Sequence, residues 1–209
     1  MNNYLNLQLI DRSSEQLSNR YQQTYVDPLL HEKLLEVMQD ADSFNANNFM
    51  EFKLEEIYQY LKCSHQYYLD VWIPKLENTL LQLNAKLGAD YKSINMLTLS
   101  LNAYKRELVL HIDQEEKILF TFVERLLAGK DCDGLKDLVL NHFIHTHDDN
   151  VILEIDQLKR EVLSIDADLQ GNLIVEVLFN QLHIFQQDLK VHGLIEDKVF
   201  LQKVIAHSS

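Results

Sequence analysis

The sequence has few of the residues that interrupt helices, with five glycines and two prolines among 209 residues. Sheets, hairpins and long linkers need more turn residues than this, so their scarcity favours long helices. Hydrophobic residues make up 46% of the chain and charged residues 24%, which is enough to fill a core and coat a surface. We therefore expect a mainly helical protein with one folded domain.

Several other features are absent. Two cysteines, Cys63 and Cys132, are too few for a disulfide framework. The N-terminus lacks the basic start and apolar core of a signal peptide, and no apolar run approaches membrane-spanning length. The formal net charge of -13 repels nucleic-acid phosphates and anionic lipid surfaces. These absences predict a cytoplasmic protein that binds neither nucleic acid nor membranes, and they leave its oligomeric state open.

The hydrophobic pattern divides the chain into two predicted parts. Residues 1–50 are predicted to form a polar N-terminal arm with one short helix, which begins at Pro28 and ends near Met38. Residues 51–209 contain four long segments with apolar residues at three- and four-residue spacing. We place these helices at about 53–87, 92–128, 135–167 and 172–206, separated by Gly88, by Gly129 with Gly134, and by Gly171.

Short connections between long helices favour antiparallel neighbours. The predicted fold class is therefore all-α, an up-down-up-down four-helix bundle with a short extra N-terminal helix. Pro74 falls inside the first long helix, where it should kink the helix or mark a local opening.

Two segments repeat one pattern, a histidine followed four residues later by a glutamate: His111 with Glu115, and His192 with Glu196. Such a pair lies on one helical face, so the imidazole can bind one metal ion while the carboxylate bridges to a second. The number of such pairs expected by chance in a chain of this composition is not far below the two that are observed. The pattern alone is therefore a weak signal. Both pairs also interrupt an apolar stripe, and a buried carboxylate must be paired or coordinated because leaving it bare is costly.

The other two long helices each add one inward histidine, His65 and His147. If the third helix is rotated, His145 or His142 takes the place of His147. Counted from a common end of the bundle, the four histidines lie about 12 to 17 residues deep, a scatter on the order of 7 Å at about 1.5 Å per residue. We therefore expect ligands from all four helices at one level.

The predicted metal ligands are His65, His111, Glu115, His147, His192 and Glu196. Four imidazoles and two carboxylates suit iron or zinc, and two bridging carboxylates suit a pair of irons that share an oxygen bridge. Six protein ligands do not fill two octahedra, which leaves positions for a diatomic molecule, peroxide or water. The Glu-x-x-His pairs of ferritin-like oxygenases and the His-Glu-x-x-His of zinc peptidases are both absent.

At these residues the sequence resembles the hemerythrin-like (HHE) cation-binding domains, in particular the branch that includes di-iron iron-sulfur cluster repair proteins. The matching segments are HQYYLDVWIPKLE, HIDQEEKILF, FIHTHDDN and QQDLKVHGLIEDKVF, within about residues 50–206. The resemblance implies the same six ligands and two non-haem iron ions. It also implies a small diatomic or peroxide ligand, and damaged iron-sulfur proteins as partners in repair or in the response to nitrosative or oxidative stress.

Three features of the sequence bear on which branch of the hemerythrin-like domains it resembles. Oxygen-carrying hemerythrins have a His-x-x-x-His pair on the third helix, whereas Val151 stands four residues after His147, which favours the repair branch. Repair proteins usually carry an N-terminal domain with a cysteine pair, but residues 1–50 contain no cysteine. The usual Leu-Phe-Pro endings are replaced by Leu-Phe-Thr at 119–121 and Val-Phe-Leu at 199–201. Two other functions stay open: a reversible dioxygen or nitric oxide sensor or store, and a metal-free helical interaction module.

Four residues near the predicted ligands have alternative interpretations. Gly193, beside His192, costs about 1 kcal/mol relative to alanine in a helix interior. We expect close approach of the first long helix, a gap for an exogenous ligand, or simple tolerance. Tyr67, Tyr68 and Tyr104 are predicted to pack in the core, with donors to the metal ligands as the alternative.

Overall fold

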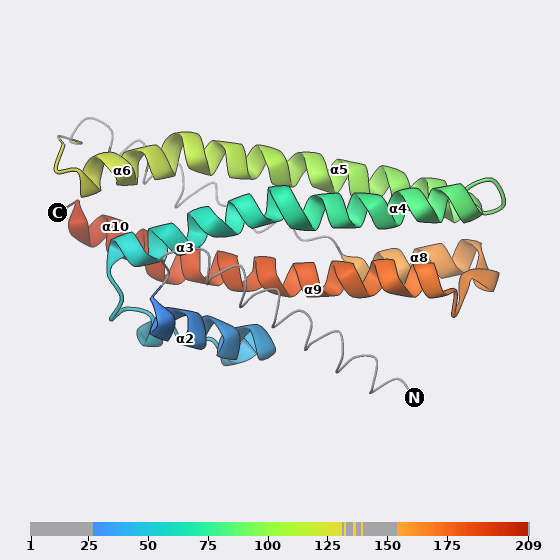
Figure 1. Cartoon of the computed structure of the whole chain (residues 1–209), viewed down its shortest axis with the longest axis horizontal. Coiled ribbons are helices and arrows are strands. Elements are labelled where there is room, and N and C mark those ends of the chain that lie inside the picture. Colours follow the sequence, from blue (N-terminus) through green and yellow to red (C-terminus); the bar gives the residue numbers. More distant parts are fainter. Residues whose placement is uncertain (1–26, 131, 133–135, 137–138, 140–153, 209) are drawn as a thin grey trace. The chain divides into compact units, whose positions relative to one another are not determined.

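The computed structural model describes residues 27–130, 132, 136, 139 and 154–208. Every regular element among these residues is a helix, and this part of the chain contains no β-strand (Figure 1). The all-α class predicted from the scarcity of glycine and proline is therefore confirmed for the described residues. None of the helices in these ranges combines the length and the apolarity needed to cross a membrane.

The chain forms two compact units. Of the described residues, unit 1 comprises 27–67 and 190–207, and unit 2 comprises 68–130, 132, 136, 139, 154–189 and 208. The predicted division into an arm and a bundle at residue 50 stays a prediction, as does the up-down-up-down order of the helices.

Helix α2 (Pro28–Gln39), in unit 1, agrees with the short helix predicted to begin at Pro28. Proline in the first turn loses no helical hydrogen bond, because an N–H group at that position has no partner within the helix. The carboxylate of Asp27 caps the helix by accepting hydrogen bonds from the backbone N–H groups of Leu29 and Leu30, at 2.8 and 3.3 Å. Leu34 is fully buried, so the apolar face of α2 is anchored by packing.

The remainder of unit 1 brings together the segment before residue 68 and the C-terminal end of the chain. Its other elements are two short 3-10 turns, η1 (Ala41–Ser43) and η2 (Ala46–Asn48), α3 (Leu54–Tyr67), the last residues of α9 (Leu173–Ile195), the π-helical segment η7 (Glu196–Phe200), and α10 (Leu201–His207). Tyr58 of α3 stacks on Phe200 of η7 with ring centroids 6.5 Å apart. Lys203 of α10 donates a 2.8 Å hydrogen bond to the carbonyl of Met50. These contacts tie α10 and η7 to the residues around α3.

Unit 2 holds most of the long helices. Its elements are the π-helical segment η3 (Tyr68–Trp72), α4 (Ile73–Leu87), α5 (Lys92–Gln114), the π-helical segment η4 (Glu115–Phe120), α6 (Thr121–Leu127), α8 (Ile155–Ile165), the 3-10 turn η6 (Ala167–Leu169) and α9 up to residue 189. A short loop joins α4 to α5, and the two helices pack side by side (Figure 1). The side-chain amide of Asn84 on α4 donates to the hydroxyl of Thr98 on α5 at 2.9 Å. Helix α8 packs against α5 as well.

The start of α5 is capped from a distant part of the sequence. Its N-cap residue, Tyr91, supplies no capping side chain. Instead, Asp166, which follows α8, accepts hydrogen bonds from the hydroxyl and the backbone N–H of Ser93, at 2.5 and 2.8 Å. A helix N-terminus has N–H groups without helical partners and a positive dipole end, so a carboxylate there is favourable. The Ser93 hydrogen bonds lower the pKa of Asp166.

The helix limits agree closely with the sequence where they can be compared. The range predicted as 53–87 contains α3, η3 and α4, and the range 92–128 contains α5, η4 and α6. The range 172–206 contains α9, η7 and all of α10 except its last residue. Of the helix predicted at 135–167, only the final part, α8, is a described element. Gly129 and Gly171 have φ angles of +65° and +75°, which is the left-handed conformation that glycine adopts after a helix.

Candidate metal centre

The first His-x-x-x-Glu pair lies in unit 2, where α5 gives way to η4. His111 is in the last turn of α5, and Glu115 is the first residue of η4. Nε2 of His111 lies 2.7 Å from Oε1 of Glu115. The Glu115 side chain is 1% exposed and that of His111 is 29% exposed. The pair thus has its carboxylate in the interior, as predicted, and its imidazole at the edge of the buried stripe.

The second pair lies in unit 1 together with a third predicted ligand. Nε2 of His192 is 3.6 Å from Oε2 of Glu196. The rings of His65 and His192 have centroids 5.0 Å apart at an interplanar angle of 41°, and a ring nitrogen of one lies within 4.8 Å of a ring nitrogen of the other. His65 and Glu196 are fully buried, and His192 is 5% exposed. His192 therefore lies beside both His65 and Glu196 among buried residues of unit 1.

Three π-helical segments adjoin the predicted ligands. Two of them begin on the glutamates of the two pairs, η4 on Glu115 and η7 on Glu196, and η3 begins three residues after His65. A π-turn adds one residue to a turn, so the residues beyond it are rotated by about 100° relative to an uninterrupted α-helix. Such turns account for well under 1% of residues in soluble proteins and are frequent at functional sites. The two pairs therefore share an uncommon backbone feature at the same position.

Local interactions fit these π-turns. The backbone N–H of Glu115 bonds to the carbonyl of His111, so the pair itself spans an α-helical turn and the wider turn follows it. After η4, the hydroxyl of Thr121 donates to the carbonyl of Glu116 at 3.1 Å. Pro74 occupies the first turn of α4, directly after η3, where its missing N–H group is tolerated. The π-turn η3 therefore lies directly before Pro74 in the helix, and the kink or local opening predicted at Pro74 stays a prediction.

The sixth predicted ligand, His147, lies outside the described residues, as do its alternatives His142 and His145. The choice among these three stays a prediction. The other described histidines differ in exposure: His207 is exposed, whereas His31 and His183 are half-buried. Nε2 of His183 lies 3.4 Å from a carboxylate oxygen of Asp156.

The surroundings of Tyr68 include a polar residue that the sequence did not single out. Asp188 is 1% exposed, and its carboxylate accepts a 3.0 Å hydrogen bond from the hydroxyl of Tyr68. The Tyr68 ring meets Phe185 edge-on at 5.4 Å, and Phe185 stacks on Trp72 at 5.4 Å. Tyr68 is thus a core residue, as predicted, but with a specific acceptor. The only sequence signal for Asp188 is its place four residues before His192.

The structure corrects one expectation about Gly193. A Cβ atom added at this glycine would meet no atom of the described residues within 4 Å. Close approach of the described residues of the first long helix is therefore not the reason for glycine at this position. Tolerance and a gap for an exogenous ligand remain the two explanations.

Comparison with known proteins gives no relative: no protein-family model, no curated protein and no solved structure matches this chain. The hemerythrin-like character therefore stays a prediction that rests on the sequence motifs quoted above. The structure itself contributes the burial, the distances and the π-turns.

Proposed function

We propose that this chain is a non-haem di-iron binding protein that acts in iron-sulfur cluster repair or in the response to nitrosative or oxidative stress. The proposed ligands are His65, His111, Glu115, His147, His192 and Glu196. The proposed fold is the up-down-up-down four-helix bundle. The observation that carries the proposal is that both His-x-x-x-Glu pairs have a buried glutamate and a π-turn that begins on that glutamate.

The burial of the carboxylates supports coordination over simple core packing. Glu115 and Glu196 are both 0% exposed. A carboxylate removed from water loses several kcal/mol of hydration, and a protein keeps such a group where partners or a metal ion compensate. Each of the two also has an imidazole one turn earlier, at 2.7 and 3.6 Å between the nearest nitrogen and oxygen atoms.

The donor chemistry of the described ligands fits iron. Imidazole nitrogen and carboxylate oxygen suit iron, and zinc accepts the same donors, whereas magnesium and calcium prefer oxygen alone. Iron bound by this set would offer open coordination positions to nitric oxide, dioxygen, peroxide or water. The chain's own residues would hold the metal in a buried environment, and His111, at 29% side-chain exposure, stands nearest to solvent among the described ligands.

A cluster-repair assay tests the proposed function. Anaerobically iron-loaded protein is mixed with an iron-sulfur enzyme whose cluster has been damaged by nitric oxide, and free iron is removed with a chelator. We expect recovery of the damaged enzyme with the wild-type chain and no recovery with Glu115→Gln. The matched control is Glu116→Gln, which alters the neighbouring exposed carboxylate. Equal recovery with all three proteins, or none with the loaded wild type, would overturn the repair role.

The same preparation separates repair from reversible gas binding. A sensor or store would change its absorption spectrum on addition of nitric oxide or dioxygen and regain the original spectrum on removal of the gas. Full reversal without any recovery of the damaged enzyme would replace repair by gas binding as the function of this site.

A further inference from the structure

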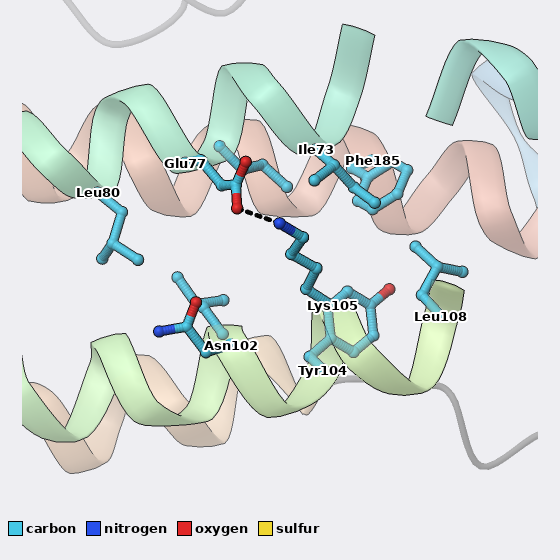
Figure 2. A pocket seen from close by; sticks show the side chains of 10 residues that line it. Ile73, Glu77, Leu80, Asn102, Tyr104, Lys105, Leu108 and Phe185 are labelled. Atoms are coloured by element: carbon cyan, nitrogen blue, oxygen red, sulfur yellow. Dashed lines mark hydrogen bonds and ion pairs between the residues drawn. The ribbon is translucent and has the colours of Figure 1, made fainter. Parts of the chain in front are cut away.

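A small apolar pocket lies in unit 2 between α4 and α5, with Phe185 of α9 forming part of its wall (Figure 2). Its volume is about 30 Å³, and six of its ten lining residues are aliphatic or phenylalanine. Leu80 projects into it from α4, and Leu101 and Leu108 line it from α5. These residues are buried, with exposures of 7, 8 and 2%. The interior of the pocket is therefore hydrocarbon rather than polar surface.

An ion pair spans one side of the pocket. Figure 2 shows the carboxylate of Glu77 on α4 and the ammonium group of Lys105 on α5 pointing toward each other across the gap between the helices. Their side chains are 42% and 39% exposed, so the pair faces solvent while the leucines face inward. Exposed ion pairs contribute little stability and break readily. The Glu77–Lys105 pair can therefore act as a polar cover that opens without disturbing the apolar walls.

Size and polarity limit what the pocket can hold. A volume of 30 Å³ is about twice what one water molecule needs, and far below the roughly 150 Å³ of a cavity that binds benzene. Water is held poorly in an apolar cavity, because it needs several hydrogen-bond partners. Burial also raises the pKa of Tyr104, which lines the pocket, as expected for a weakly polar environment. We infer that the pocket binds a small apolar molecule of diatomic size, the class to which dioxygen and nitric oxide belong.

The position of the pocket suggests its role. Leu108 stands three residues before His111 on α5, so one wall residue of the pocket lies about one helical turn from the imidazole of the first His-x-x-x-Glu pair and about two turns from Glu115. A gas molecule concentrated there would be held beside a proposed metal ligand. This role as a supply site rests on the proposed function, whereas binding of a small apolar molecule does not.

Xenon tests the binding in the metal-free full chain, because xenon is apolar, of similar size and chemically inert. Under xenon pressure we expect saturable shifts in the methyl NMR signals of Leu80, Leu101 and Leu108. Leu101→Phe should weaken xenon binding roughly tenfold, because the larger ring takes up the space. The matched control is Leu99→Phe, which alters a side chain on the same helix that is 72% exposed. Absence of saturable shifts in the wild type, or equal shifts in folded Leu101→Phe, would overturn the inference.

A second variant and a kinetic measurement distinguish failure of gas binding from failure of the supply role and of the proposed function. If Leu101→Phe fails to fold, Leu80→Phe fills the pocket from α4 and is interpreted in the same way. In iron-loaded protein, stopped-flow mixing with nitric oxide should give a slower binding rate for the filling variant than for Leu99→Phe. An unchanged rate with lost xenon binding would overturn the supply role. Failure of the chain to take up iron would instead overturn the proposed function, and the xenon result would still decide whether the pocket binds gas.

Discussion

Replacing Glu196 with glutamine should abolish the stabilisation that ferrous iron gives to the fold. Glu196 is fully buried, begins the π-turn η7 and lies near His192. Glutamine keeps the size of the side chain but removes the negative charge, and a neutral amide oxygen is a much weaker iron ligand than a carboxylate. The metal-free variant should therefore still fold, while its affinity for iron falls.

The expected magnitude follows from linkage. A ligand that binds only the folded chain at 100 times its dissociation constant adds about 2.7 kcal/mol to the free energy of unfolding. For a chain of 209 residues, each kcal/mol raises Tm by about 2–4 °C. Iron should therefore raise the Tm of the wild type by roughly 5–10 °C, and by less than about 2 °C in Glu196→Gln.

The assay is anaerobic thermal unfolding followed by far-ultraviolet circular dichroism, with and without ferrous iron. The metal-free Tm of each protein is its own baseline, so a general loss of stability in the variant does not affect the comparison. Glu116→Gln removes an exposed carboxylate and should keep the full wild-type shift. A wild-type shift that persists in Glu196→Gln would refute the assignment of Glu196 as a ligand.

Two further predictions concern the helices around the site. Gly193→Ala should raise the free energy of unfolding by about 1 kcal/mol, because alanine has the higher helix propensity and its Cβ would meet no described atom within 4 Å. Chemical denaturation measures this free energy, and a lower value in the variant than in the wild type would contradict the prediction. Asp166→Ala should lower stability at neutral pH, because its carboxylate accepts two hydrogen bonds from Ser93 at the start of α5. These hydrogen bonds lower the pKa of Asp166 in the folded protein below the ordinary value of an aspartate. Its contribution to stability is therefore present above that ordinary value and is lost as the pH falls through the folded pKa. The difference between wild type and variant should therefore shrink as pH is lowered from neutral, whereas Asp168→Ala, at an exposed position, should show little difference at any pH.

Helix limits were predictable because their signals are local. Pro28 marks the first turn of α2, and Gly129 and Gly171 adopt the left-handed conformation that other residues reach only at a cost. The apolar spacing also placed Glu115 and Glu196 in the interior, where the structure has them. In each case a residue and its near neighbours carry the information that the prediction needs.

The remaining features depend on interactions that the apolar spacing does not encode. An α-turn and a π-turn differ by one residue in hydrogen-bond register, so the same apolar stripe is compatible with either, and η4 and η7 could not be predicted. The cap of α5 joins Ser93 to Asp166, 73 residues away, and depends on the packing of α8 against α5. The carboxylate of Asp188 is likewise explained only by its contact with Tyr68, 120 residues away in the sequence.

Iron content is the most direct test of the central claim that the two His-x-x-x-Glu pairs and their partners hold metal. The full chain is loaded with ferrous iron under anaerobic conditions, freed of unbound iron, and analysed for iron and protein. We predict about two irons per chain for the wild type and for His183→Ala, which alters a half-buried histidine on α9 that is not a proposed ligand. We predict a clear loss for His192→Ala on the same helix. Wild-type protein without iron, or His192→Ala with an unchanged iron content, would contradict the claim.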